Sequence, residues 1–120
     1  MEKQTLIIGA SEKIDRYSNM AAVRLKEHGV DFIPLGLKSG VVAGKEILTG
    51  KPDMKNIHTV TMYINPERQK DYYEYIFSLQ PKRVIFNPGT ENEDLAKQLE
   101  SKGVEVVEGC TLVMLGSGQF

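Results

Sequence analysis

Five short apolar segments alternate with segments of helical periodicity along this chain, and this alternation constrains the fold more than any other feature. The apolar segments cover residues 5–8, 30–35, 59–64, 83–86 and 104–107. Alternating β and α elements with apolar strands favour a parallel sheet that carries helices on both faces. Right-handed crossovers then fix most of the topology. We therefore predict a doubly wound α/β fold with a five-stranded parallel sheet.

Capping residues predict where the intervening helices begin and end. Apolar residues recur at helical spacing within residues 19–28, and Gly29 follows as a C-terminal cap. Asn65 and Pro66 suit the N-cap and the first turn of a second helix. The run Thr90-Glu91-Asn92-Glu93 has the form of a capping box and predicts the start of the last helix.

Two segments lie outside this regular pattern. Residues 36–55 are rich in glycine, and we expect them to be irregular. We expect the apolar tail from Thr111 to Leu115 to add a short edge element. Because edge strands are normally protected, this tail either covers a sheet edge or pairs with another subunit, which leaves a homo-oligomer as one option.

Length and charge limit the number of domains and the classes of partner. The chain has 120 residues, of which 41% are hydrophobic, so we expect residues 1–120 to form one domain. The formal net charge of -1 gives none of the basic surface that duplex nucleic acid requires. No segment approaches the roughly 20 apolar residues of a membrane span. We expect neither nucleic acid nor a membrane as a partner.

The segment from Gly9 to Asn19 combines the features of a phosphate site. It follows the first strand, and doubly wound sheets bind ligands at the carboxyl ends of strands. Small residues there let a ligand approach the backbone, and the following helix presents unpaired N–H groups and a positive dipole end. Ser11 and Ser18 offer hydrogen bonds, and Arg16 offers charge. The alternative interpretation is that Gly9 only forms a turn and Ser18 only caps the helix.

The same strand ends argue against an ordinary NAD site. After Gly9 the chain lacks the second and third glycines of the G-x-G-x-x-G pattern. The acidic residue that holds the ribose 2′-hydroxyl at the end of the second strand is also missing, and Lys38 follows that strand. A lysine there suits a ribose with an additional phosphate, as in coenzyme A or NADP. The alternative is an ordinary solvated lysine.

Several runs resemble those of the small CoA-binding domain proteins, whose fold also occurs in the CoA-binding domain of the succinyl-CoA synthetase α subunit. Gly9-Ala10-Ser11 and Arg16-Tyr17-Ser18-Asn19, with Ala22, resemble the opening of that family. Asn87-Pro88-Gly89-Thr90 resembles its later Pro-Gly segment, and residues 103–107 with Cys110 resemble its last strand and terminal cysteine. The resemblance covers nearly the whole chain and implies a Rossmann-like fold.

Carried over residue by residue, the resemblance implies coenzyme A or acyl-CoA as the cofactor. It places the following residues around the pyrophosphate: Gly9, Ala10, Ser11, Arg16, Tyr17, Ser18 and Asn19. It places Lys38 beside the adenosine, and Asn65, Pro66, Pro88 and Gly89 along the remaining strand-end loops. Two segments depart from the family. Leu35-Gly36-Leu37 stands where the family often has Asn-Pro, and Glu108-Gly109 stands where it often has Asp-Arg.

No set of residues in the sequence predicts catalysis or metal binding. Neither His28 nor His58 lies at a spacing typical of metal ligands. Cys110 is open to two interpretations, a thiol that exchanges with coenzyme A or a buried, inert cysteine. Its sequence neighbours include no basic residue, which favours the inert cysteine. A single cysteine also fits a reducing compartment, so we expect a cytoplasmic protein.

Three hypotheses about function are compatible with these residues. The leading hypothesis is a module that binds coenzyme A or acyl-CoA and has no catalytic activity of its own. The first alternative is an enzyme component, either NADP-dependent or associated with an acyl-CoA ligase on a larger partner chain. The second alternative is an interaction protein that has lost the ligand.

Overall fold

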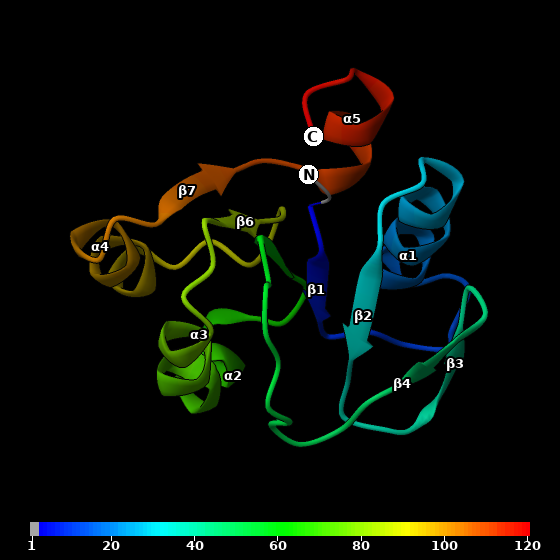
Figure 1. The fold of residues 1–120 in the computed structure, drawn as a ribbon, viewed down its shortest axis with the longest axis horizontal. Helices are drawn as coiled ribbons and strands as arrows, with labels where there is room; N and C mark the ends of the chain where they lie inside the picture. The colour runs from blue at the N-terminus through cyan, green and yellow to red at the C-terminus, as the bar shows by residue number, and fades with distance from the viewer. Residues whose placement is uncertain (1–2) are drawn as a thin grey trace.

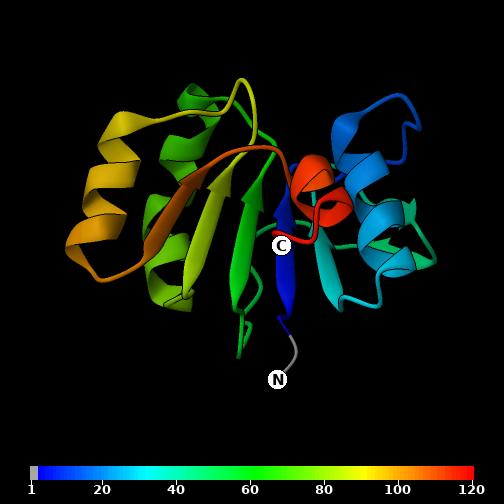
Figure 2. The ribbon, with the colours of Figure 1, turned by 90° about the horizontal axis from the view of Figure 1, so that it is seen from above.

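A parallel sheet lies at the centre of the computed structural model, which describes residues 3–120 (Figure 1). Its strands are β1 (Thr5–Ile8), β2 (Phe32–Leu35), β5 (Thr59–Met62), β6 (Arg83–Phe86) and β7 (Glu105–Glu108). They pair in the order β2-β1-β5-β6-β7, and every pair is parallel. Figure 2 shows the strands side by side, with β7 at one edge and β2 at the other. The predicted doubly wound, Rossmann-like α/β sheet is confirmed.

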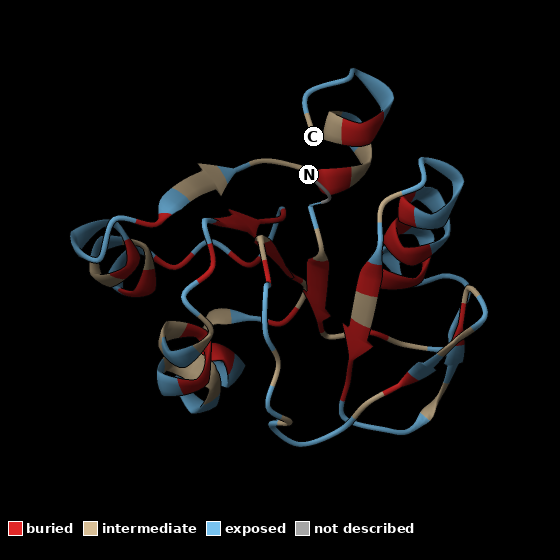
Figure 3. Ribbon diagram, viewed as in Figure 1, coloured by how far each residue is buried: buried red, intermediate tan, exposed pale blue. Residues whose placement is uncertain are grey.

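Helices cover both faces of this sheet. They are α1 (Tyr17–Glu27), α2 (Pro66–Gln69), the 3₁₀ turn η1 (Lys70–Tyr72), α3 (Tyr73–Leu79), α4 (Glu93–Ser101) and α5 (Thr111–Gly116). Leu6 and Ile8 belong to the apolar core under α3 and α4, whereas Ile7 belongs to the core under α1 and α5. Because successive strand residues point to opposite faces, the apolar run Leu6-Ile7-Ile8 of β1 contributes to both cores. Figure 3 shows the resulting burial of the central strands.

Helix ends follow the predicted capping residues in two cases. Gly29 has a φ of 71° and follows α1, and the N–H of Val30 donates to the carbonyl of Leu25 at 2.9 Å. This hydrogen bond gives a donor to a carbonyl in the last turn of the helix, which has no intrahelical partner. Asn65 is the N-cap of α2, and Pro66 occupies its first turn, both as predicted.

The start of α4 corrects a sequence prediction. Its N-cap is Asn92, whose side-chain oxygen accepts the N–H of Leu95 at 3.1 Å. The hydroxyl of Thr90 instead donates to the carbonyl of Asn87 at 2.8 Å. Because that hydroxyl closes the turn after β6, it does not cap the helix, and the predicted capping box at Thr90–Glu93 is wrong.

The tail from Thr111 to Leu115 forms helix α5, so the predicted edge element is also wrong. Thr111 and Leu115, one helical turn apart, are both buried, while Val113 is exposed. Leu115 joins the apolar core that contains Ile7 and the buried face of α1. The tail therefore covers part of one sheet face instead of extending the sheet.

Residues 36–55 contain more structure than the sequence predicted. Strands β3 (Gly40–Val42) and β4 (Lys45–Ile47) form an antiparallel hairpin, and Leu48 beyond it pairs with Leu35 of β2. Their buried ends, Val42 and Ile47, join the core beside α1. The hairpin is thereby anchored next to the carboxyl end of β2.

Candidate functional site

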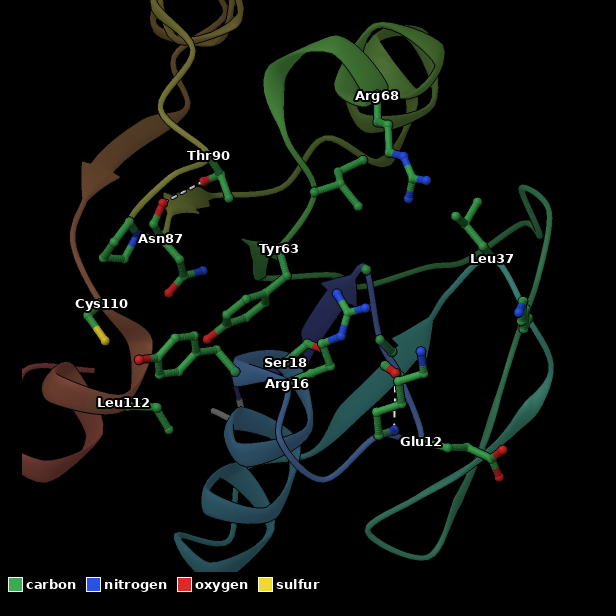
Figure 4. A pocket seen from close by; sticks show the side chains of 18 of the residues that line it. Glu12, Arg16, Ser18, Leu37, Tyr63, Arg68, Asn87, Thr90, Cys110 and Leu112 are labelled. Atoms are coloured by element: carbon green, nitrogen blue, oxygen red, sulfur yellow. Dashed lines mark hydrogen bonds between the residues drawn. The ribbon is translucent and has the colours of Figure 1, made fainter.

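A cavity of about 850 Å³ opens at the carboxyl ends of the strands, beside the point where the strand order reverses between β1 and β5 (Figure 4). It is lined by Gly9, Ala10, Ser11, Glu12, Lys13, Arg16, Tyr17, Ser18, Leu37, Lys38, Ser39, Tyr63, Ile64, Arg68, Asn87, Pro88, Thr90, Cys110 and Leu112. Doubly wound sheets bind ligands at this position, and the volume lies within the range of small-molecule sites.

Close backbone packing shapes the floor of the cavity. The N–H groups of Gly9 and Ala10 both donate to the carbonyl of Leu35 at 2.9 Å, which holds the ends of β1 and β2 together. A Cβ on Gly36 would lie 2.4 Å from the carbonyl oxygen of Ala10. Any larger residue at this position would push the two strand ends apart. The glycine within Leu35-Gly36-Leu37 is therefore a packing requirement of this chain.

The beginning of α1 faces the cavity. The helix begins at Tyr17, two residues before the predicted start, and its N-cap Arg16 makes no side-chain capping bond. The first N–H groups of a helix have no intrahelical acceptors and carry the positive end of the dipole. Asn19 lies behind this surface, where its Nδ2 donates to the carbonyl of Ser11 at 3.0 Å. It fixes the loop before the helix without lining the cavity.

Basic side chains dominate the charge of the cavity. Lys13, Arg16, Lys38 and Arg68 line it with one acid, Glu12. In the described residues 3–120, none of these cations forms an ion pair. The carboxylate of Glu12 accepts the N–H of Val41 at 2.8 Å, which ties it to the hairpin. Figure 4 shows the guanidinium groups of Arg16 and Arg68 reaching from opposite sides into the space between them.

Cys110 and Leu112 lie at the end of the cavity away from Leu37 (Figure 4). Cys110 is a free cysteine and is half-buried at the cavity wall. The favoured interpretation of Cys110 as a buried, inert cysteine is therefore wrong in its burial, while its reactivity stays a prediction. The chain turns after β7 at Gly109, where α5 follows immediately, and this turn brings residues 110 and 112 to the strand ends.

Tyr63 adds a neutral, buried hydroxyl to the same part of the site. Its oxygen is shielded from solvent and has no well-aligned hydrogen-bond partner within residues 3–120. Burial raises the pKa of Tyr63 to about 12, although the nearby hydroxyls of Thr111 and Thr61 act in the opposite direction. The phenol consequently stays protonated at neutral pH and adds no charge to the cavity.

The structure brings most of the predicted site residues together. The cavity is lined by Gly9, Ala10, Ser11, Arg16, Tyr17, Ser18, Lys38 and Pro88 among them. Asn19, Asn65, Pro66 and Gly89 do not line it. Asn65 and Pro66 start α2, and Gly89 occupies an exposed turn with a φ of 90°. Cofactor contact by any of these residues stays a prediction.

Sequence reasoning missed several lining residues, of which Arg68 matters most. Arg68 is the third residue after the N-cap Asn65, so it lies in the first turn of α2, next to the strand ends. A basic residue three positions after a predicted N-cap was the available signal. Tyr63 and Ile64 were equally predictable, because they directly follow the third strand of the sheet.

Residues 3–120 contain neither a candidate metal-binding cluster nor a membrane-spanning helix. No group of three or more His, Cys, Asp or Glu side chains there is placed to hold a metal ion. No helix in that range has the length and apolar character to cross a membrane.

A family model shows the family of this chain, and solved structures show its fold. A family model described as the CoA binding domain matches residues 3–116. A crystal structure of an uncharacterized protein has 55% sequence identity and a TM-score of 0.97, with 100% of this chain and 99% of that chain covered. A hypothetical protein from Pyrococcus horikoshii OT3 has 25% identity and a TM-score of 0.87, with 97% and 83% covered. A Thermus thermophilus structure has 20% identity and a TM-score of 0.86, with 99% and 91% covered, and therefore supports the fold alone. Comparison with curated proteins gave no match. The chain belongs to the CoA-binding domain family.

Proposed function

We propose that this protein binds coenzyme A or an acyl-CoA thioester in the cavity at the strand ends and has no catalytic activity of its own. One observation carries the proposal. In a chain of the CoA-binding domain family, Arg16, Arg68 and the start of α1 converge on a single cavity. Two guanidinium groups and a helix N-terminus form a site for a doubly charged pyrophosphate.

The pyrophosphate lies against the first turn of α1 in this proposal. The loop from Gly9 to Ser11 presents only small residues, so a phosphate group can approach the backbone closely. Asn19 supports this arrangement because its bond to the Ser11 carbonyl holds the loop against the helix. Arg16 and Arg68 supply charge-assisted hydrogen bonds from both sides.

The uncharged pantetheine arm extends toward Cys110 and Leu112. Leu112 offers apolar surface at this end, which lies away from Arg68, and the nearby Tyr63 stays neutral. We infer binding without catalysis because the titratable groups lining the cavity form no nucleophile–base pair in the part of the chain that the structure describes. Glu12 bonds to a backbone N–H, and the Tyr63 hydroxyl has no well-aligned partner.

Isothermal titration calorimetry with coenzyme A, acetyl-CoA, NADP and NAD tests the proposal. We expect saturable one-to-one binding of coenzyme A or acetyl-CoA. NADP and NAD should bind at least about tenfold more weakly, which corresponds to about 1.4 kcal/mol. A preference for acetyl-CoA over coenzyme A would identify an acyl thioester as the ligand. No heat with any of the four nucleotides, or tightest binding of NADP or NAD, would overturn the proposal.

A further inference from the structure

A second cavity adjoins the first on the side of β2 and α2. Its volume is about 510 Å³, and its lining residues are Gly9, Gly36, Leu37, Gly50, Lys51, Ile64, Arg68, Asp71 and Tyr72. Gly9, Leu37, Ile64 and Arg68 line both cavities. The two cavities therefore meet along a shared border at Arg68 and provide room for one extended ligand.

Charge is distributed unevenly along the combined site. Cys110 and Leu112 lie at one end of the main cavity, away from Leu37 and Arg68 (Figure 4). Arg16 lies between that end and Arg68, and Lys51 adds a further cation in the second cavity. A ligand with a neutral arm at one end and an extra phosphate at the other is thus oriented with that phosphate toward Lys51.

Lys51 is available for such a phosphate. It is exposed and forms no ion pair within residues 3–120, and its Nζ lies 5.6 Å from the centroid of the half-buried Tyr72 ring. The carboxylate of Asp71 lies in the same cavity and repels an anion. It forms no ion pair with Lys51 or Arg68, so it does not neutralise either cation. The net charge of these three side chains stays positive. The aromatic surface beside the ammonium suits a nucleobase.

We propose that the second cavity holds the phosphorylated nucleoside end of coenzyme A and that Lys51 recognises its additional ribose phosphate. This inference rests on the proposed function and makes Lys51 a specificity-determining residue of the same site. Lys38 is the competing residue, since it lines the main cavity but not the second one. Lysine ammonium groups bind terminal phosphates as point charges, so the contribution of Lys51 depends on that phosphate being present.

Calorimetry with coenzyme A and with dephospho-coenzyme A, which lacks the ribose phosphate, tests this inference. The wild-type protein is compared with Lys51→Gln, Lys38→Gln and Lys55→Gln at one ionic strength. Lys55 is a matched control, because it is an exposed lysine from the same connecting segment that lines neither cavity. We expect Lys51→Gln to weaken coenzyme A binding about tenfold and to change dephospho-coenzyme A binding by less than about twofold. Lys55→Gln should leave both affinities unchanged.

The outcomes separate this inference from the proposed function. Suppose that the wild-type protein binds coenzyme A. If Lys51→Gln then weakens the binding of both ligands equally, or changes the binding of neither, the assignment of Lys51 is wrong while the proposed function stands. The same holds if Lys38→Gln alone removes the discrimination between the two ligands. If the wild-type protein binds neither ligand, the proposed function fails, and this inference fails with it.

Discussion

The side-chain oxygen of Asn87 accepts the backbone N–H of Thr111 at 2.9 Å, which ties the end of β6 to the start of α5. The amide nitrogen of Asn87 donates to the hydroxyl of Thr61 at 2.7 Å and to the carbonyl of Met62 at 2.8 Å. One buried amide thus connects two neighbouring strand ends with the helix that follows Cys110. The wall of the cavity at Cys110 depends on this connection.

Replacing Asn87 with Ala should destabilise the fold by about 3 kcal/mol, because it leaves several buried groups without partners. Thr111→Val is the matched comparison. It removes the 2.8 Å hydroxyl contact with Thr61 but keeps the backbone N–H that bonds to Asn87. We expect a cost of about 1 kcal/mol for this variant. Urea unfolding measures both changes, and equal costs for the two variants would contradict the central role of Asn87.

Gln69 connects the loops after β5 and β6 from the other side of the sheet. Its Nε2 donates to the carbonyls of Ile64 and Thr90 at 2.9 and 2.7 Å, and its Oε1 accepts from Asn92 at 2.9 Å. Gln69→Ala should therefore lower the free energy of unfolding by about 3 kcal/mol. Gln98→Ala, which removes an amide bonded only at the exposed surface of α4, should change it by less than about 0.5 kcal/mol. Similar costs in urea unfolding would argue against a buried bridge at Gln69.

A methyl group at position 36 should be poorly tolerated. The Cβ of Gly36→Ala would overlap the backbone of Ala10, and separating β1 from β2 there should cost about 2 kcal/mol or more. Gly116→Ala is the control, since a Cβ there has its nearest neighbour at 3.9 Å and Gly116 lies in α5. Thermal unfolding should show a lower midpoint for Gly36→Ala only. A midpoint at or above that of the wild type for Gly36→Ala would show that the close approach is not rigid.

His58 should make stability depend on pH. Burial lowers the pKa of His58 below its usual 6.5, and the nearby charges of Arg83, Lys3 and Lys82 lower it further against the effect of Glu105. The unfolded chain therefore takes up a proton at higher pH than the folded chain. The contribution of His58 to the free energy of unfolding is fully present above pH 6.5. It is lost as the pH falls through the lowered pKa of the folded state.

Urea unfolding at about pH 7.5 and about pH 5.5 checks this sign. His58→Gln should lose less stability than the wild-type protein over that interval, because it lacks the titrating ring. An identical loss of stability in His58→Gln and the wild type would contradict a lowered pKa.

The sheet was predictable because its signals are local. The central strands β1, β5 and β6 are short and fully buried, and Gly29 and Asn65 have cap geometries that short-range chemistry dictates. The start of α4 was not predictable to the residue. Thr90 and Asn92 are both good caps, and a bond from Thr90 to Asn87 in the preceding turn decides between them. The tail formed α5 because helical spacing buries Thr111 and Leu115 on one face.

The candidate site was predictable along the first strand-end loop and less so elsewhere. Arg16 and Ser18 lie at the end of the loop from β1 to α1 and in the first turn of α1, where sequence position alone implies proximity to a ligand. Arg68 and Cys110 reach the cavity from α2 and from the turn before α5. The spacing after the N-cap Asn65 places Arg68 in the first turn of α2, near the strand ends. The placement of Cys110 depends on how α5 docks on the sheet, which the spacing of residues in the chain does not encode.

Titration of coenzyme A into the wild-type protein, Arg16→Gln, Arg68→Gln and Arg24→Gln tests the central claim most directly. Arg24 is the control, because it is exposed on α1, pairs with Glu27 at 3.5 Å and does not line the cavity. We predict that each cavity variant binds coenzyme A at least about tenfold more weakly, and that Arg24→Gln stays within about twofold of the wild type. Wild-type affinity in both Arg16→Gln and Arg68→Gln would contradict the account, as would the absence of coenzyme A binding by the wild-type protein.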